Sequence, residues 1–356
     1  MEDLKTFQLN IFNEINKLNI GKNFMISPLS IYHILSLTTN GAVDKTLQEM
    51  LKALSENDLK SMNLVNQNLH TEIKKLTTVE LANAVFTKFK PELDFTNMIA
   101  QYKAEVNILE SVEQVNKWCQ EKTHGKIPKI LDSLSPNDFM ILINAIYFKG
   151  KWEKAFNKKN TIKKKFMNFN KTPKNIPFMN AEEKFMYFED KEVQALALKY
   201  KKDNLEALIL LPKNNMDINN FISNLTSQKY QEIISKRYNY TVKLYMPKFV
   251  INFETELKPC FNSLGMIDAF SDNAKFTNIS KNLDLYIGKI LHKTFIEVDE
   301  EGTTAAAVTA SVVKVRGCIP NDNVIMNVDH PFLFIIRSNQ LPLNHDILFI
   351  SKVEAL

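Results

Sequence analysis

The residues best able to take part in chemistry lie in one segment of this 356-residue chain, 299–316. Three acids, Asp299 to Glu301, precede Gly302, and the eleven residues 303–313 carry no charge. They are small or aliphatic, and Ala and Thr without Gly or Pro are unusual in a loop, because loops favour turn formers. As a strand these eleven residues would span roughly 36 Å, about twice a typical strand. We interpret the segment as a strand that has not joined a sheet, ending at Arg316, a basic residue that a protease could cut.

Alternation along this segment would place small, neutral side chains on one face of a sheet. Such side chains can enter a buried sheet face at modest cost, whereas a charge there would be strongly unfavourable. The alternating set is Thr303, Ala305, Ala307, Thr309, Ser311 and Val313.

The usual motifs of catalytic and cofactor sites are missing from the chain. It has eight glycines, and the closest two, Gly288 and Gly302, lie fourteen positions apart, which excludes a G-x-G-x-x-G or phosphate-binding loop. G-x-S-x-G, H-E-x-x-H and C-x-x-C are also absent, and the six histidines lack metal-ligand spacing. We therefore expect no enzyme, no cofactor and no metal site, although a catalytic triad scattered along the chain stays open at this point.

Composition indicates an ordinary globular protein. The formal charge of +5 is spread over many small runs, of which Lys158–Lys165 is the sharpest. We interpret that run as a solvated hairpin face in preference to a polyanion site, and we expect no nucleic-acid partner. The chain contains no run of about eighteen apolar residues, so we expect no membrane span.

The amino terminus and the cysteines indicate the cellular compartment in which the protein is expected. The start of the chain lacks a basic stretch followed by an apolar core, so it does not resemble a signal peptide. Cys119, Cys260 and Cys318 are odd in number and far apart, which argues against a disulfide framework and favours a reducing compartment.

Periodicity predicts mostly helices before residue 140 and mostly strands after it. Residues 1 to about 76 are mostly helical in pattern, and Ser27-Pro28 could start a helix. Ile141 to Phe148 is almost wholly apolar, as in a strand buried on both faces. The order indicates an α+β protein without alternating βαβ units. The length of 356 residues would suggest two or three domains, but no Gly/Ser- or Pro-rich linker divides the chain, so one large domain is equally allowed.

Segments throughout the chain resemble motifs of the serpins, the serine protease inhibitor family. The resemblance implies a single domain, 1–356, with the serpin fold: mostly antiparallel or mixed β-sheets, a helical N-terminal half and an exposed reactive-centre loop at about 300–325. The similar segments are Asn23–Ile31, Asn144–Trp152, Met246–Phe249, Leu264–Met266, Leu291–Lys293, Glu300–Gly302 with its Ala/Thr stretch, His330–Phe334 and Ile347–Ile350.

The resemblance also implies functional residues. In the family the scissile bond follows the residue fourteen positions past the hinge glycine, and counting from Gly302 gives Arg316–Gly317. The implied hinge comprises Glu300, Glu301, Gly302, Thr303, Thr304, Ala305, Ala306 and Ala307.

A sheet-opening region is implied as well. Ser27 and Ser30 are interpreted as buried hydrogen-bonding groups, and His292 as the polar residue that they would meet. Asn144 and Trp152 belong to the main-sheet strand of the family, where Trp152 would pack over the sheet.

The function implied is inhibition by a suicide substrate. A protease attacks the scissile carbonyl and forms an acyl-enzyme, the freed loop inserts as a new strand, and deacylation stalls. Arg316 would enter a pocket with a buried acid, which predicts a trypsin-like target. Val315 beside it leaves papain-like cysteine proteases as an alternative. Two more functions stay open, a non-inhibitory serpin and a simple protease substrate that is cleaved without trapping.

Three positions depart from the family pattern. Thr304 stands where inhibitory serpins often have an acid, and Val308 is β-branched, but both have the outward parity. Cys318, two residues past the scissile bond, is interpreted as an incidental thiol, with redox tuning of target choice as the alternative.

The expected partner is a target protease and the expected state a monomer. A polyanion cofactor has thin support from Lys60, Lys74 and Lys75. The absence of a signal peptide predicts a cytoplasmic or nucleocytoplasmic protein, with leaderless secretion to the extracellular space as the alternative.

Overall fold

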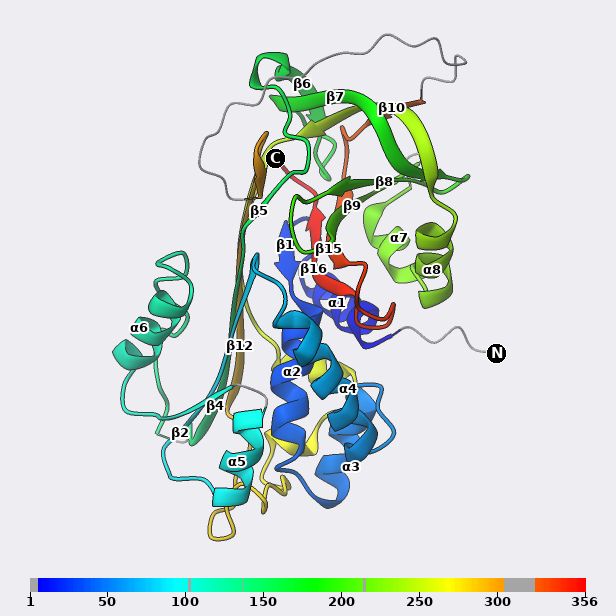
Figure 1. Cartoon of the computed structure of the whole chain (residues 1–356). Helices are drawn as coiled ribbons and strands as arrows, with labels where there is room; N and C mark the ends of the chain where they lie inside the picture. The colour runs from blue at the N-terminus through cyan, green and yellow to red at the C-terminus, as the bar shows by residue number, and fades with distance from the viewer. Residues whose placement is uncertain (1–5, 102–103, 137, 214–215, 304–323) are drawn as a thin grey trace.

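A computed structural model of the chain describes residues 6–101, 104–136, 138–213, 216–303 and 324–356 (Figure 1). Two β-sheets and a set of helices build one α+β body. The helices are α1 (Phe7–Leu18), α2 (Pro28–Thr39), α3 (Asp44–Ala53), α4 (Leu59–Ile73), α5 (Leu93–Gln101), α6 (Val112–Lys122), α7 (Ile218–Asn224), α8 (Ser227–Ser235) and α9 (Lys258–Ser263), with 3-10 turns at Lys158–Asn160 and Asp268–Phe270.

A seven-stranded sheet runs through the molecule, and we call it the main sheet. Its outer strand β11 pairs with β12, and β13 lies between β12 and β5. In order, its strands are β3 (Glu105–Ile108), β2 (Val79–Thr87), β4 (Met140–Phe148), β12 (Lys289–Val298), β13 (Gly302–Thr303) and β5 (Gly150–Lys151), with β11 (Phe249–Glu256) beside β12.

A nine-stranded sheet packs beside it. Strand β6 (Ile162–Met167) pairs with β7, outside the main order of this sheet. The other strands, in order, are β1 (Phe24–Ile26), β16 (Ile347–Val353), β15 (Phe332–Ser338), β9 (Leu205–Pro212), β8 (Val193–Lys199), β7 (Pro173–Glu189), β10 (Tyr238–Pro247) and β14 (Val324–Asn327).

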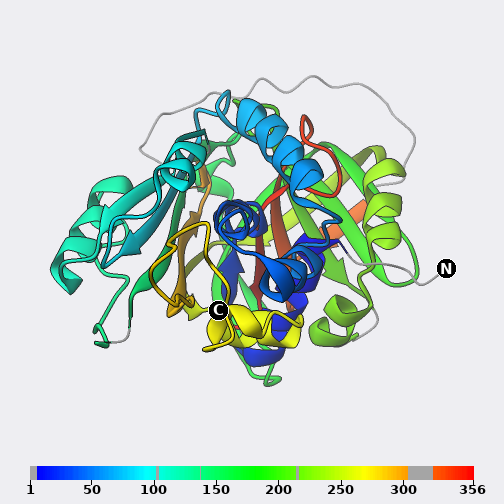
Figure 2. The same cartoon turned by 90° about the horizontal axis from the view of Figure 1, so that it is seen from below.

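Strand β4 is buried on both faces, as its apolar sequence predicts. Met140, Leu142 and Ile146 join the large core that includes α1 and α2. Ile141 and Ile143 join a second cluster that includes Val115 and Cys119 of α6. Because successive side chains of a strand point to opposite faces, α6 must cover one face of the main sheet and the N-terminal helices the other. Seen from below, the blue N-terminal helices lie near the centre and α6 at the edge (Figure 2).

Helix α2 begins where Ser27-Pro28 predicts a start. The Ser27 hydroxyl accepts a hydrogen bond from Ser30 N, and Pro28 occupies the first turn, where no backbone donor is needed. All twelve residues of α2 are buried, which is typical of a helix inside the core of a large protein.

The expected division of the chain at residue 140 holds in outline. Strands β1, β2 and β3 precede that point, and the helices α7, α8 and α9 follow it. No helix in the described ranges is long and apolar enough to cross a membrane.

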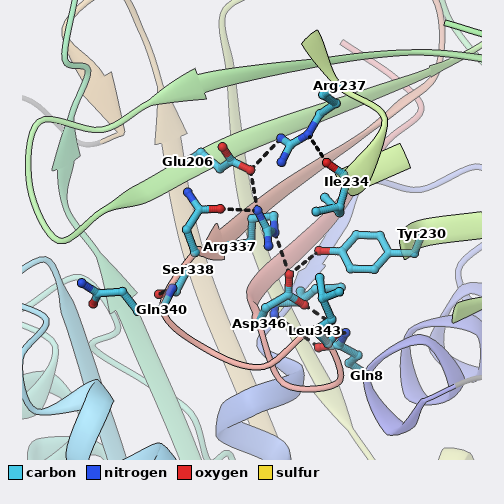
Figure 3. A network of polar contacts seen from close by, with 12 residues as sticks. Gln8, Glu206, Tyr230, Ile234, Arg237, Arg337, Ser338, Gln340, Leu343 and Asp346 are labelled. Atoms are coloured by element: carbon cyan, nitrogen blue, oxygen red, sulfur yellow. Dashed lines mark hydrogen bonds and ion pairs between the residues drawn. The ribbon is translucent and has the colours of Figure 1, made fainter. Parts of the chain in front are cut away.

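A buried charged network joins β9, β15 and α8 in the nine-stranded sheet (Figure 3). Arg337 donates from Nη1 to Glu206 Oε1 and from Nε to Asp346 Oδ2, both at 2.6 Å. Arg237 Nη1 donates to the same Glu206 oxygen at 2.6 Å. Burial opposes ionisation of Glu206, but the two guanidinium groups outweigh it and lower the pKa of this carboxyl.

Asp346 extends this network towards the amino terminus. It accepts from Tyr230 of α8 at 2.9 Å and from the Gln8 amide of α1 at 3.3 Å. The charged network therefore fastens α1 and α8 to the nine-stranded sheet.

Candidate functional site

The described start of the hinge lies at one end of the main sheet. Asp299 closes a tight turn, because its Oδ1 accepts from Glu301 N at 2.8 Å and from Gly302 N at 3.2 Å. Thr303 then pairs antiparallel with Val298 of β12 and with Gly150 of β5. Gly302 and the first residue of the long uncharged segment thus already occupy a place between two main-sheet strands.

Gly302 is required here by close packing. Its φ is +156°, and a Cβ at this position would lie 2.2 Å from the Gly150 carbonyl oxygen. In this structure the absent side chain lets the backbone of Gly302 approach β5.

Thr303 is fully buried and has a hydroxyl partner. Its Oγ1 lies 2.7 Å from the Tyr200 hydroxyl, and burial raises the pKa of Tyr200, which keeps this phenol neutral. The Tyr200 ring stacks on Trp152, with centroids 4.6 Å apart and planes inclined by 20°. Trp152 Nε1 donates to Asp299 O at 2.9 Å. Trp152 therefore contacts the turn at Asp299, before Gly302, and Tyr200 contacts it at Thr303, after Gly302.

Two carboxylates anchor the hinge to the nine-stranded sheet and its connection. Glu300 accepts from the Thr161 hydroxyl at 2.7 Å and from Lys248 Nζ at 2.8 Å. Burial raises the pKa of Glu300, but these hydrogen bonds outweigh it and lower the pKa below its usual value. Glu301 pairs with Lys158 at 2.5 Å.

Between the hinge and the opposite end of the main sheet, β4 and β12 pair directly with each other. Their parallel register runs from Lys289 opposite Ile141 to Phe295 opposite Tyr147. One row crosses the sheet, with Asn83 of β2 opposite Asn144 and Asn144 opposite His292. We call the contact between β4 and β12 the seam.

The polar side chains of this row meet the start of α2. His292 Nδ1 lies 2.5 Å from Asn144 Oδ1, and Ser27 N donates to His292 Nε2 at 3.2 Å. The Asn144 amide nitrogen donates to Ser30 Oγ and Asn83 Oδ1. Because Nε2 accepts from a backbone N–H, Nδ1 must carry the ring proton and donate to Asn144.

This seam network is uncharged. Burial lowers the pKa of His292 to about 3, so the imidazole is neutral near pH 7. Its members are Ser27, Ser30, Asn83, Asn144 and His292, all buried.

Comparison with known proteins identifies the family. Residues 2–355 match the sequence profile of the serpins, serine protease inhibitors. The chain is 32% identical to the leukocyte elastase inhibitor of Xenopus laevis, over 95% of this chain and 96% of that protein. The chain belongs to the serpin family. It is thus grouped with inhibitors and not with catalysts.

Solved serpin structures agree with this assignment over nearly the full length. The thermophilic serpin tengpin in its native state superimposes with a TM-score of 0.90 and 34% identity, over 99% of this chain and 92% of that chain. Human thyroxine-binding globulin in complex with its ligand gives a TM-score of 0.87 and 25% identity, over 99% and 96%. The serpin fold expected from the motifs is confirmed.

The residues expected to form the sheet-opening region divide into two places in this serpin. Ser27, Ser30, Asn144 and His292 come together in the seam network. Trp152 lies apart from them, at the hinge.

Sequence reasoning missed several partners in this serpin. Asn83 had a weak signal, since it is an amide inside an apolar strand. Tyr200, Lys248, Lys158 and Thr161 had none, because their partners lie at least 50 positions away in the chain. Thr304, Ala305, Ala306, Ala307, Arg316, Gly317 and Cys318 lie outside the described residues.

Proposed function

We propose that this serpin inhibits trypsin-like serine proteases as a suicide substrate, with Arg316–Gly317 as the bond presented to the protease. The observation that carries the proposal is the pairing of Gly302 and Thr303 between β12 and β5. A strand continuing from Thr303 would run into the seam. The eleven uncharged residues from Thr303 onward supply such a strand.

Insertion requires β4 and β12 to separate and to form new ladders with the inserted strand. The backbone hydrogen bonds lost along the seam are then replaced, so the net cost falls mainly on the side chains. Neutral, small residues on the inward parity keep that cost low. We assign the sheet-opening role to the seam network, because its Asn144–His292 hydrogen bond joins the two strands that must part.

Arg316 supports trypsin-like specificity, since a buried acid in the protease pocket would pair with a guanidinium. A second candidate comes from the relative named leukocyte elastase inhibitor. Elastase has a small primary pocket, which suits Val315 better than Arg316. Cleavage by such an enzyme would therefore fall one bond earlier.

Two more functions have some support. Papain-like cysteine proteases suit the Val315-Arg316 pair. A ligand carrier without inhibitory activity has a precedent in the fold, since thyroxine-binding globulin is a structural neighbour. The uncharged, proline-free stretch after Gly302 favours inhibition over the carrier function.

We expect this serpin to act as a cytoplasmic or nucleocytoplasmic monomer, with leaderless secretion as the alternative. Cys119 and Cys260 are buried free thiols, and burial raises the pKa of each to about 12. They are therefore inert, and neither forms a disulfide among the described residues. Fractionation of cells that express the chain, with the culture medium as one fraction, tests the location.

The deciding experiment mixes the protein separately with trypsin, elastase and papain, followed by a denaturing gel and the intact mass of the released C-terminal peptide. With trypsin we expect a covalent band near the summed masses and a peptide that begins at Gly317. A trapped elastase with a peptide beginning at Arg316 would replace the trypsin-like assignment. Cleavage without any covalent band would make the protein a substrate or a carrier.

A matched variant tests the bait residue. Arg316→Ala should abolish the trypsin complex, because the small side chain leaves the acid of the trypsin pocket without a cation. The same variant should retain thermal stability. If it traps trypsin as well as the parent does, Arg316 is not the residue that enters the pocket.

A further inference from the structure

The seam between β4 and β12 ends in a fork at the upper end of the main sheet (Figure 1). Its last pair joins Tyr147 to Phe295. Three residues further along the two strands, Gly150 and Val298 no longer pair with each other, because both pair with Thr303. Neighbouring strands lie about 4.8 Å apart, so the two arms of the fork are about 10 Å apart at the hinge. We call β5, which continues β4, the outer arm.

The turn that joins β8 to β9, residues 200–204, contacts the outer arm of the fork. Lys201 N donates to Lys151 O at 2.9 Å. On the same turn, the Tyr200 hydroxyl lies 2.7 Å from Thr303 Oγ1. The β8–β9 turn therefore touches both the outer arm and the residue that fills the gap.

Asp203 extends from this turn to the start of β2. Its Oδ2 accepts from Thr77 N at 2.8 Å, from Thr78 N at 2.9 Å and from Thr78 Oγ1 at 2.6 Å. Its Oδ1 accepts from Thr77 Oγ1 at 3.2 Å. Thr78 O in turn accepts from the backbone N of Lys149, the residue between β4 and β5, at 2.9 Å. One carboxylate thus connects the β8–β9 turn, through Thr78, to the point where the outer arm leaves β12.

The residue type and the backbone conformation at position 203 suit this contact. Asp203 and Asn204 have φ angles of +65° and +54°, in the left-handed region that Asp and Asn enter more readily than other non-glycine residues. An ionised carboxylate only accepts, and it can take several donors at once. Within the described residues, every hydrogen bond found for this carboxylate comes from Thr77 or Thr78. The side chain therefore serves the contact with β2 and not its own turn.

The β8–β9 turn and β2 lie on opposite sides of the seam. Strand β2 pairs with β4 along its whole length, from Val79 to Thr87, so these two strands move together. Strands β8 and β9 belong to the nine-stranded sheet. That sheet is fastened to β12 through β1, since Thr294 Oγ1 of β12 donates to Met25 O at 2.8 Å. Asp203 consequently joins the β12 side of the seam to the β4 side.

We infer that Asp203 is a positioning residue for insertion of the reactive loop: it holds β2 and the outer arm at the distance from β12 that admits the hinge. Without this contact the outer arm is free to close on β12, because two unpaired strand edges gain hydrogen bonds by pairing. Closure would displace Gly302 and Thr303 from the gap. The contact is present in the uncleaved chain, whereas its role in trapping a protease rests on the proposed inhibitory function.

Three variants isolate the carboxylate. Asp203→Gly removes it and allows the positive φ without strain. Asn204→Gly is the matched control, because it makes the same turn more flexible, also at a positive φ, and leaves Asp203 in place. Thr77→Val with Thr78→Val removes the two donating hydroxyls from the β2 side and keeps the backbone amides and the branched shape. If Asp203→Gly fails to fold, the valine pair tests the same contact.

Hydrogen exchange of the full chain, measured by mass spectrometry, tests the position of the hinge without a protease. In Asp203→Gly we expect the amides of 299–303 and of β5 to exchange at least about tenfold faster than in the parent, because hydrogen bonds to a charged acceptor are lost. The valine pair should fall between the two, and Asn204→Gly should stay within about twofold of the parent. Unchanged exchange of 299–303 in Asp203→Gly would overturn the assignment.

Insertion itself is measured by the uptake of a synthetic peptide of residues 303–313 and by the number of serpin molecules consumed for each trypsin trapped. Asp203→Gly should take up the peptide at least about fivefold more slowly, because the entry to the seam is closed more of the time. It should also consume more serpin for each complex, while the initial rate of cleavage at Arg316 equals that of the parent. A general loss of stability would not separate these two rates. Faster uptake by Asp203→Gly would show that the contact restrains the seam, and would overturn the proposal.

The outcomes separate this inference from the proposed function. Faster exchange at the hinge of Asp203→Gly, in a protein whose parent traps no protease, would refute the proposed function and leave the positioning role in place. Equal changes in Asp203→Gly and Asn204→Gly would show that the flexibility of the β8–β9 turn, and not the carboxylate, sets the position of the hinge. That result would overturn the inference.

Discussion

Two buried polar networks in this serpin differ in charge. The network in the nine-stranded sheet is charged, with Glu206 and Asp346 paired to Arg337 and Arg237. The seam network in the main sheet consists of hydroxyl, amide and neutral imidazole groups. Both are buried to a similar degree, so burial does not explain the difference.

The difference corresponds to what each region has to do. Removing one partner of a buried ion pair costs about 3–5 kcal/mol, which suits a contact that stays closed. Leaving a neutral buried group without its partner costs about 1–3 kcal/mol, so a neutral seam can part more readily. A charge in the seam would have to be buried again when the inserted strand covers it. Neutrality is therefore the property that the seam shares with the segment proposed to enter it.

The largest effect should come from a charge placed at the hinge, where the inserted strand would begin. In Thr303→Arg a cation replaces a fully buried hydroxyl whose partner is the neutral Tyr200. Burial without an opposite charge is more costly than any contact described above. We expect the variant to be cleaved by trypsin but to give no covalent complex on a denaturing gel.

Thr303→Ser serves as the control because it keeps the hydroxyl and the size class. It should trap trypsin with the parent stoichiometry. Full trapping by Thr303→Arg would mean that this side chain does not face inward on insertion, and that the parity assigned to residues 303–313 is wrong.

The second-largest effect should be on the free energy of unfolding, and it should come from the charged network and not from the seam. Arg337→Ala leaves Asp346 without its cation, and we expect a loss of about 3–5 kcal/mol in the free energy of unfolding. Arg237→Ala should cost less, because Glu206 keeps its pair with Arg337. Denaturant unfolding followed by tryptophan fluorescence measures both.

Trapping of trypsin by the folded fraction should be unchanged in both arginine variants. A change in stoichiometry for Arg337→Ala, at conditions where the protein is folded, would show that the charged network also takes part in insertion.

Local patterns in the sequence predicted the elements better than the contacts between them. The apolar run of β4 and the cap at Ser27-Pro28 depend on neighbouring residues, and both predictions are confirmed. The family motifs placed Ser27, Asn144 and His292 in one region, because each motif has a known place in the serpin fold. The pairing of Asn83 with Asn144 depends on strand register, which alternation leaves undetermined.

The hinge shows the limit of motif reasoning more clearly. Trp152 was grouped with the seam residues because it lies on the same strand motif as Asn144. A strand rises about 3.3 Å per residue, so eight positions put the two side chains roughly 26 Å apart along the sheet. Tyr200 could not be predicted, since it reaches Trp152 through a single bridge from the other sheet.

The smallest effect should come from charging the seam by acid. The pKa of His292 is lowered to about 3 from an ordinary value of 6.5, so the folded protein keeps this ring neutral while the unfolded chain takes up a proton. The stability from the neutral ring is therefore complete above about pH 6.5 and declines as the pH falls towards 3. At about 1.4 kcal/mol per pH unit, the loss from this residue is about 2 kcal/mol at pH 5.

His292→Gln isolates this contribution, because a glutamine can donate to Asn144 and accept from Ser27 without titrating. Between pH 7 and pH 5 it should lose less thermal stability than the parent. His345→Gln is the matched control: burial lowers the pKa of His345 to about 4, but this ring packs against Tyr32, away from the seam.

Acid should speed the uptake of a synthetic peptide of residues 303–313 by the parent and by His345→Gln, because a protonated His292 cannot accept from Ser27 N. If His292→Gln shows the same acceleration, a group other than His292 controls the opening of the seam.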